Sequence, residues 1–375
     1  MAESKLFALE DRDDEPYRLT SVTERDVFTT PSDPDVETLL KRIESGELVL
    51  RPEFQRTDVW GIAKKSKLIE SLLLNLPIPP CFFAEDRNGV RVVVDGQQRL
   101  RAIDDFCHGR FKLTALQVMP ELIGCSWSSL PSELRRKLLQ RVIRTLVISH
   151  HTPSEIRFEI FERLNTGGEP LTDQEIRNGT LRGSLNDLLD KLAHNREFLD
   201  LIGKKSPDPR LRHHELVLRY LALSHDLNAY FPPLKFFLTE FMRSSRDINS
   251  AHATALEISF NEALRGCGTV FGNHAFRRFR LDRSTGGRYE RVMNRAVFDI
   301  QMLGFAGVDI TQLIARQAEI QNAFLDLCTS DNEFIESLTR ATDHRSRLVF
   351  RMSTWFNTLE GIGIVVPLLK QLPRA

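Results

Sequence analysis

A carboxylate, a glycine, two amides and a guanidinium follow one another where a predicted strand becomes a predicted helix. Directly after the valine run 92–94 come Asp95, Gly96, Gln97, Gln98 and Arg99. Backbone N–H groups at a helix start attract anions, and a glycine lets a phosphate approach the backbone closely. The arginine adds a two-pronged donor that suits phosphate oxygens. These residues therefore predict a phosphate-binding turn.

The same five residues have a purely structural interpretation. The spacing of Asp95 and Gln98 fits a capping box, in which both side chains bond backbone N–H groups at the start of a helix. Strand, turn and helix would then form a well-capped junction without a ligand. Short motifs of this kind have a high false-positive rate, so the residue types alone leave both interpretations open.

Two further segments carry polar residues suited to a nucleotide. The loop RPEFQRTDVW (51–60) contains Gln55 and Arg56 between aromatic side chains that can stack on a base. The segment FERLNTGGEPLTDQEIRNG (161–179) contains Asn165 and Gly167 in a turn, followed by a capping-box pair, Thr172 and Glu175. Each segment also has a structural explanation, as core anchors in the first and helix caps in the second.

Hydrophobic periodicity predicts the elements around these segments. The pattern predicts helices at 35–45 and 64–76, and strands at 48–50, 81–85 and 90–95, the last two joined by a turn at Asn88 and Gly89. The helix after Asp95 continues over 101–108, and 142–149 holds another β-branched run. Beyond 153 nearly every segment is helical, and two prolines in 201–212 favour a domain boundary there. The predicted fold class is α+β followed by all-α.

Charge is balanced overall but unevenly distributed. The 375 residues contain 51 basic and 51 acidic side chains, which argues against a protein that binds polyanions over its whole surface. Residues 1–40 hold eleven acids and four bases, a net charge of −7, so the remainder carries +7. Four clustered arginines are candidate DNA contacts: Arg277, Arg278, Arg280 and Arg283. The alternative is an ordinary solvated surface.

The cysteines and the termini bear on where the protein works. Five cysteines are widely spaced and include no C-x-x-C pair, so neither a disulfide framework nor a zinc knuckle is expected. The first residues are acidic where a signal peptide would be basic, and no apolar run is long enough to span a membrane. We expect a cytoplasmic protein with reduced thiols and no membrane partner.

Four ordered motifs resemble one protein family. They are RPEFQRxxVW (51–60), LIESLLLNLPIPP (68–80), VVDGQQRL (93–100) and FERLNTGGxxLxxxEIRNG (161–179). In order and spacing the chain resembles the N-terminal domain of GmrSD-type restriction endonucleases, a family with a ParB/sulfiredoxin-like fold. With the charge distribution and the prolines near 201–212, the resemblance predicts three parts: an acidic segment at 1–30, a ParB-like nucleotide-binding domain at 31–203 and a helical domain at 210–375.

The resemblance also implies an activity and its residues. It implies a domain that binds a nucleoside triphosphate with Mg²⁺, and hydrolyses it, in bacterial defence against foreign DNA. Asp95 would position the metal or water, Gln97 or Gln98 would orient the attacking water, and Arg99 would stabilise phosphoryl charge. Nucleotide contacts would come from Gln55, Arg56, Gly96, Asn165 and Gly167.

Two other functions compete with this prediction. One is a non-hydrolysing ParB-like module for DNA binding or assembly that uses the arginines near 277–291. The other is a metal-dependent nuclease, although the histidines of the second half lack the spacing of an HNH motif, and neighbours such as His213 and His214 point to different helix faces. We therefore expect the nuclease to be a separate subunit.

Overall fold

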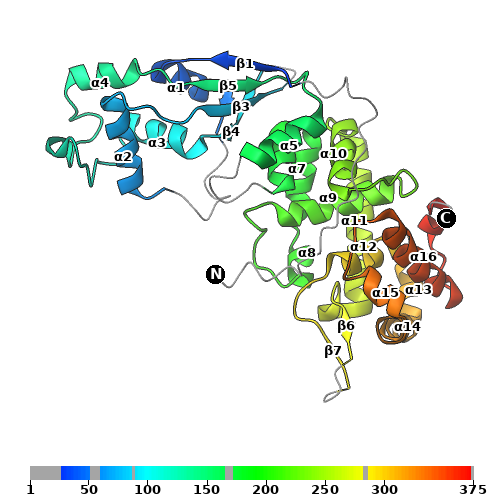
Figure 1. The fold of residues 1–375 in the computed structure, drawn as a ribbon. Coiled ribbons are helices and arrows are strands. Elements are labelled where there is room, and N and C mark those ends of the chain that lie inside the picture. The colour runs from blue at the N-terminus through cyan, green and yellow to red at the C-terminus, as the bar shows by residue number, and fades with distance from the viewer. Residues whose placement is uncertain (1–26, 51–59, 87–88, 165–171, 282–285, 373–375) are drawn as a thin grey trace. The chain divides into compact units, whose positions relative to one another are not determined.

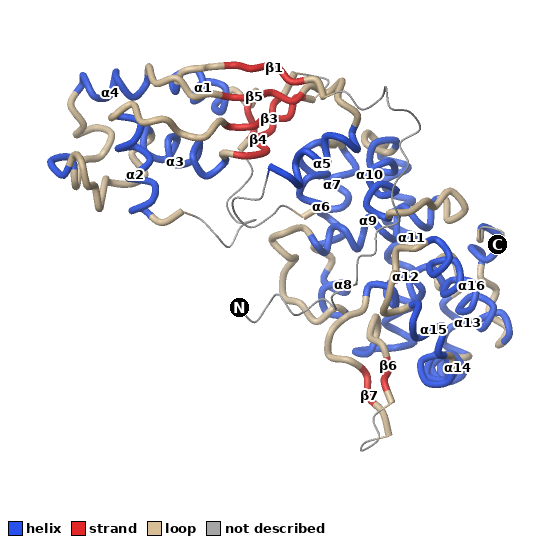
Figure 2. The backbone as a smooth tube through the Cα atoms, viewed as in Figure 1, coloured by secondary structure: helices blue, strands red, loops and turns tan. Residues whose placement is uncertain are grey.

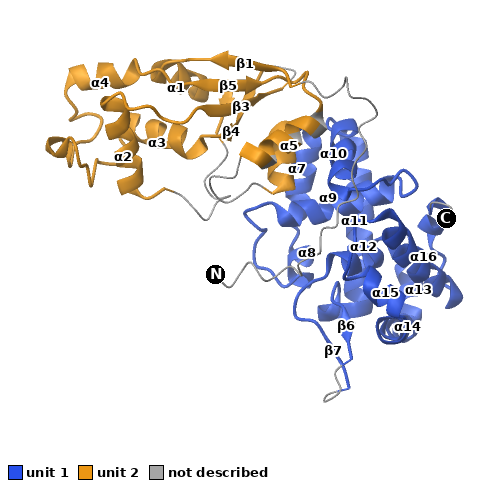
Figure 3. Ribbon diagram, in the orientation of Figure 1, with its two compact units in different colours: residues 1–18, 181–375 blue, residues 19–180 orange. Residues whose placement is uncertain are grey.

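The computed structural model describes residues 27–50, 60–86, 89–164, 172–281 and 286–372, which fall into two compact units (Figure 3). One lies within 19–180 and the other within 181–375. This division comes earlier in the chain than the predicted boundary at 203–210. The reason is that Leu185, Leu188 and Phe198 belong to the hydrophobic core of the helical unit.

The first unit combines strands and helices (Figures 1 and 2). Its strands are β1 (Thr29–Ser32), β2 (Leu48–Val49), β3 (Cys81–Glu85), β4 (Arg91–Asp95) and β5 (Thr145–Ile148). Its helices are α1 (Val36–Glu44), α2 (Ile62–Leu73), α3 (Gln97–Cys107), η4 (Pro120–Leu122), α4 (Ser132–Leu139), α5 (Ser154–Leu164) and α6 (Asp173–Thr180).

The five strands form one mixed sheet in the order β1-β5-β3-β4-β2. Strand β3 is antiparallel to β4 and parallel to β5, while β1 is antiparallel to β5 and β2 is parallel to β4. Since β3 and β4 run in opposite directions, the end of β4 at Asp95 lies beside the start of β3, where Phe82 is the partner of Asp95. This edge of the sheet carries the candidate site.

Both faces of the sheet are buried. On one face Cys81, Phe83 and Val93 share a hydrophobic core with residues of helices α1 to α4. Side chains alternate along a strand, so neighbours Ala84 and Val94 face the opposite side, where they are also buried. Helix α5 contacts β4. Strand β4 is thus fixed from both sides, which gives its last residue a defined position.

The second unit is mostly helical. Its helices are α7 (Ser184–Ala193), α8 (Arg196–Leu201), α9 (Arg212–His225), α10 (Leu234–Ser244), α11 (Ser250–Phe271), η6 (Gly272–His274), α12 (Arg295–Gly304), α13 (Ile310–Ala315), α14 (Gln317–Ser330), α15 (Asn332–Ser337), α16 (Arg345–Gly361) and η7 (Pro367–Gln371). It also contains the two-stranded hairpin β6 (Phe279–Arg280) and β7 (Arg288–Tyr289). The α+β class with a helical second part is confirmed, but the hairpin makes an all-α description incomplete.

The five cysteines differ in burial. All five cysteines are free, and three of them, Cys81, Cys267 and Cys328, are buried. Within the ranges that the structure describes, no helix combines the length and the apolar character that crossing a membrane requires.

A buried charge cluster joins three helices of the second unit. Nε of Arg219 on α9 donates to Oδ1 of Asp299 on α12 at 3.1 Å, and Nη2 of Arg351 on α16 lies 3.6 Å from Oδ2 of the same carboxylate. All three side chains are almost fully buried. Nη1 of Arg351 also donates to the carbonyl of Thr342 at 2.6 Å. Asp299 is therefore the acceptor on which two buried guanidinium groups depend.

Replacing Asp299 with alanine should strongly destabilise the helical unit. Removing the charged partner of a buried ion costs about 3–5 kcal/mol, and here two guanidinium groups lose the carboxylate that they share. Chemical denaturation of Asp299→Ala measures the loss. Glu240→Gln is the control: it breaks an exposed pair with Arg243, which should cost less than about 1 kcal/mol. Equal losses in the two variants would contradict this account of the core.

Candidate functional site

A tight corner joins β4 to α3. Strand β4 ends at Asp95, Gly96 has a φ of +94° in the left-handed region, and α3 begins at Gln97. Gly96 is the N-cap residue, and no side chain caps the helix there. The capping-box interpretation of Asp95 and Gln98 is therefore wrong, because Asp95 is still a strand residue and its carboxylate bonds a different group.

Arg99 holds the corner together. Its Nη2 donates to Oδ2 of Asp95 at 2.7 Å. Its Nη1 donates to the carbonyl oxygens of Pro79 and Pro80, the latter at 3.3 Å. Only 11 % of the Arg99 side chain is exposed. The guanidinium thus ties the residues before β3 to the end of β4 and to the first turn of α3.

Pro79 and Pro80 are site residues that the sequence did not single out. They close the LNLPIPP segment, part of one of the four motifs, directly before β3. Each offers a backbone carbonyl to Arg99. The only sequence signal for this role was their place in a motif, because a carbonyl acceptor depends on no side-chain type.

Asp95 keeps one carboxylate oxygen available. Its Oδ2 accepts from Arg99, whereas Oδ1 has no hydrogen-bond partner within the described part of the chain. The side chain is 38 % exposed. A solvent-accessible carboxylate oxygen is a suitable ligand for Mg²⁺, which binds proteins through one or two carboxylates and completes its shell with water and phosphate.

Gly96 packs closely against the start of β3. A Cβ atom at this position would lie 2.4 Å from Sγ of Cys81 and 3.3 Å from Nη2 of Arg99. Burial raises the pKa of the Cys81 thiol to about 11, so the group is an uncharged packing partner. Glycine is therefore required here for two reasons, its backbone conformation and its lack of a side chain.

Gln98 connects the corner to the RPEFQRTDVW segment. Its Oε1 accepts from the backbone N–H of Trp60 at 3.3 Å, and the Trp60 ring lies 4.5 Å from Nζ of Lys64. The last residue of that segment thus reaches the first turn of α3. Gln97, the neighbouring amide, is buried.

Four predicted nucleotide contacts lie outside the described residues, namely Gln55, Arg56, Asn165 and Gly167. The segment that follows is described. The backbone N–H of Thr172 donates to Glu175 at 2.7 Å, and the N–H of Glu175 donates to the Thr172 hydroxyl at 3.2 Å. The predicted capping box at the start of α6 is confirmed.

The arginines proposed for DNA differ sharply in their surroundings. Arg277 donates to the carbonyls of Leu201 and Ala275 at 3.0 and 2.8 Å. Arg278 pairs with Glu290 at 2.7 Å and is 11 % exposed, whereas Arg280 is 66 % exposed. Arg283 lies outside the described residues. Arg277 and Arg278 are therefore engaged with protein groups, and Arg280 faces solvent.

The paired histidines are structural. Nδ1 of His213 accepts from the backbone N–H of Asp208 at 2.9 Å, and Nε2 of His214 lies 3.1 Å from Asp190. They point to different partners, as predicted. Among the residues with described positions, no group of three or more His, Cys, Asp or Glu side chains is arranged to hold a metal ion.

A Gly96→Ala variant should destabilise the first unit. An alanine in the left-handed region costs about 1–2 kcal/mol, and the contact with Cys81 adds to this. Gly109→Ala at the other end of α3 is the control, since Gly109 has a φ of +71° but a Cβ there would meet no atom within 4 Å. Thermal unfolding should show a larger loss for Gly96→Ala, partly rescued by Cys81→Ala. An equal loss in both glycine variants would contradict the packing role.

His213 should make the protein less stable in mild acid. Burial lowers the pKa of His213 from 6.5 to about 4, so between these values the unfolded chain binds a proton that the folded chain excludes. Stability is present above pH 6.5 and falls as the pH approaches 4. Denaturant unfolding of wild type and His213→Asn across this window measures the effect. The variant should show a shallower pH dependence, and an unchanged slope would contradict the assignment.

The part of the chain that holds this corner matches a known family. Residues 36–182 match the family model of the GmrSD restriction endonuclease N-terminal domain. The match covers the whole sheet except β1, together with α1 to α6, and so includes the Asp95–Arg99 corner. No curated protein matches the chain. Residues 36–182 therefore belong to the GmrSD restriction endonuclease N-terminal domain family.

Proposed function

We propose that the Asp95–Arg99 corner binds a nucleoside triphosphate with Mg²⁺ and hydrolyses it, and that the chain is a regulatory subunit of a DNA-directed restriction-like system. One observation carries the proposal. A partly exposed carboxylate with an available oxygen, Asp95, directly precedes a helix start that has no side-chain cap. This combination offers a metal ligand and a phosphate site within five consecutive residues.

The phosphate site would be the first turn of α3. The N-terminus of an 11-residue helix carries a partial positive charge and orphan N–H groups. Gly96 has no side chain to satisfy them or to block an incoming phosphate. The Gln98 amide nitrogen donates to no acceptor in the described ranges, so it can serve a phosphate oxygen or the attacking water.

Asp95 would hold the metal. The ion supplies charge neutralisation for the phosphates when it is bound. The carboxylate suits this role because Arg99 fixes one oxygen and leaves the other accessible. Strand β4 in turn fixes the backbone of Asp95, since Val93 and Val94 are buried on opposite faces of the sheet.

Arg99 takes a different role from the one the motif implied. Its guanidinium already donates to Asp95, Pro79 and Pro80, so we assign it to positioning the carboxylate and the helix start. Backbone N–H groups and Gln98 would then be the main groups that stabilise the phosphoryl charge. Lysine should replace Arg99 poorly, because an ammonium group lacks the planar fork that spans these acceptors.

The regulatory role rests on the family match. The matched domain is the N-terminal domain of a restriction endonuclease family, and it occupies less than half of this chain. We propose that nucleotide turnover in this domain controls a nuclease carried by a separate subunit. A pull-down with DNA and nucleotide present would identify that partner.

Turnover should depend on Asp95 and on Arg99. In a phosphate-release assay with Mg²⁺ and a panel of nucleoside triphosphates, with and without DNA, Asp95→Asn should lower kcat by about 10²–10³. Arg99→Ala and Arg99→Lys should both lose activity because the carboxylate is no longer held. Thermal unfolding of each variant separates loss of function from loss of folding.

Glu85→Gln is a matched control. It removes the ion pair between Oε1 of Glu85 and Nη2 of Arg91, which are 3.1 Å apart. This pair lies at the other end of strands β3 and β4 from Asp95. Its turnover should equal that of wild type. No phosphate release with any nucleotide, or full activity in Asp95→Asn, would overturn the proposal.

A further inference from the structure

The β6–β7 hairpin carries a pair of arginines that lie directly opposite each other. In its register Phe279 is the partner of Tyr289, and Arg280 is the partner of Arg288. Successive residues of a strand face opposite sides, so the aromatic pair and the arginine pair lie on opposite faces of the hairpin. Figure 1 shows the hairpin extending from the helices of its unit.

The aromatic face anchors the hairpin. The rings of Phe279 and Tyr289 are in edge contact, with their centroids 5.2 Å apart. The Tyr289 ring also stacks on the His274 ring, with a centroid distance of 4.3 Å. Both residues pack against the core of the helical unit, and β6 contacts α14. A Cβ at Gly287 would lie 2.5 Å from the Phe279 ring, so this glycine lets the ring cover the returning strand. The orientation of the hairpin is therefore fixed.

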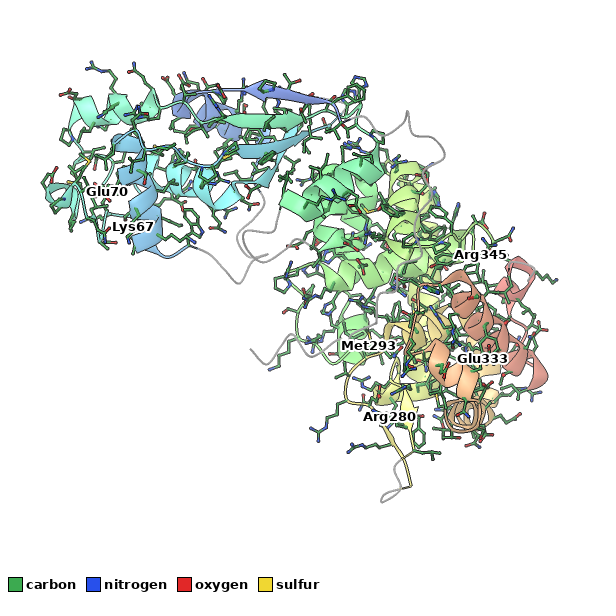
Figure 4. All side chains as sticks on the ribbon, in the orientation of Figure 1. Lys67, Glu70, Arg280, Met293, Glu333 and Arg345 are labelled. Atoms are coloured by element: carbon green, nitrogen blue, oxygen red, sulfur yellow. The ribbon has the colours of Figure 1, made fainter. Side chains whose placement is uncertain are left out.

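The opposite face presents the arginines to solvent. Arg280 is labelled in Figure 4 and is 66 % exposed, and Arg288 is exposed as well. Directly opposed like charges, about 4.5–5.5 Å apart at Cα, are unfavourable in a sheet without a counter-ion. Oε1 of the neighbouring acid Glu290 lies 2.7 Å from Nη2 of Arg278 and 3.5 Å from Nη1 of Arg280. The shorter distance makes Arg278 the main partner of Glu290.

Arg288 and Arg291 reinforce the excess of positive charge. Neither forms an ion pair with any residue in the described ranges, and both are exposed. In sequence, 277–291 contains six arginines and two acids. Since Arg277 and Arg278 serve protein acceptors, the outward charge of the hairpin comes from Arg280 and Arg288, and exposed Arg291 lies just beyond β7. The hairpin thus holds an excess of positive charge on one rigid surface.

We propose that this surface, formed by Arg280 and Arg288, binds the phosphate backbone of duplex DNA. A two-stranded ribbon fits the major groove, and guanidinium groups bond phosphate oxygens in pairs. DNA is favoured over an acidic protein because residues 36–182 match a domain of a restriction endonuclease family. The proposal rests on that part of the proposed function and is independent of nucleotide hydrolysis. The binding surface lies outside the matched domain, which ends at residue 182.

Salt dependence of DNA binding tests the proposal. Fluorescence anisotropy of a labelled duplex of about 20 base pairs is measured with the full chain at several salt concentrations. The logarithm of the association constant falls linearly with the logarithm of the salt concentration, and each lost phosphate contact makes this slope less steep by about 0.9. The double variant Arg280→Ala with Arg288→Ala should therefore reduce the steepness by about 2. Affinity at low salt should fall at least tenfold.

A matched control removes two exposed arginines elsewhere on the same unit. Arg196→Ala with Arg316→Ala breaks exposed pairs with Asp200 and Glu319 and changes the charge equally. This variant should keep the wild-type slope and affinity. An unchanged slope in the hairpin variant, an equal loss in the control, or binding of polyglutamate in preference to DNA would overturn the proposal. The hairpin variant should retain phosphate release, so failure of the nucleotide proposal would appear separately, as no release in wild type.

Discussion

The ion pair between Asp95 and Arg99 is the constraint on which the candidate site depends. Through Arg99 it joins the carbonyls before β3, the last residue of β4 and the first turn of α3. Gly96 makes this possible, because only a residue without a Cβ can adopt its φ of +94° so close to Cys81. The same geometry leaves a carboxylate oxygen and an uncapped helix start within one turn of chain.

Much of the fold could be predicted from local patterns. Strands β3 and β4 were predictable because two β-branched or aromatic runs flank an Asn-Gly turn, and the corner was predictable because Asp-Gly ends the second run. Strand β1 was not, since Thr29–Ser32 shows no alternation and pairs with β5 far along the chain. The two compact units divide at residue 181, before the prolines, because helices α7 and α8 pack into the core of the second unit.

The chemistry of individual side chains was less predictable. Sequence identified Arg99 by its motif, but its partners include backbone carbonyls that no side-chain pattern indicates. The clustered arginines of the second unit appeared equivalent in sequence. In the structure, however, Arg278 is largely buried against Glu290, whereas Arg280 is exposed. Glu70 on α2 illustrates the same limit (Figure 4): it is buried and accepts three backbone N–H groups of residues 117–119, at 2.8–3.0 Å. Such roles follow from tertiary contacts.

The central claim is that phosphate binds at the first turn of α3. Hydrogen exchange of backbone amides, measured with and without a slowly hydrolysed nucleoside triphosphate analogue and Mg²⁺, reports directly on those N–H groups. We predict slower exchange at residues 96–100 when both are present, and little change when Mg²⁺ is omitted. Unchanged exchange there at saturating nucleotide, with protection confined to other segments, would contradict the claim.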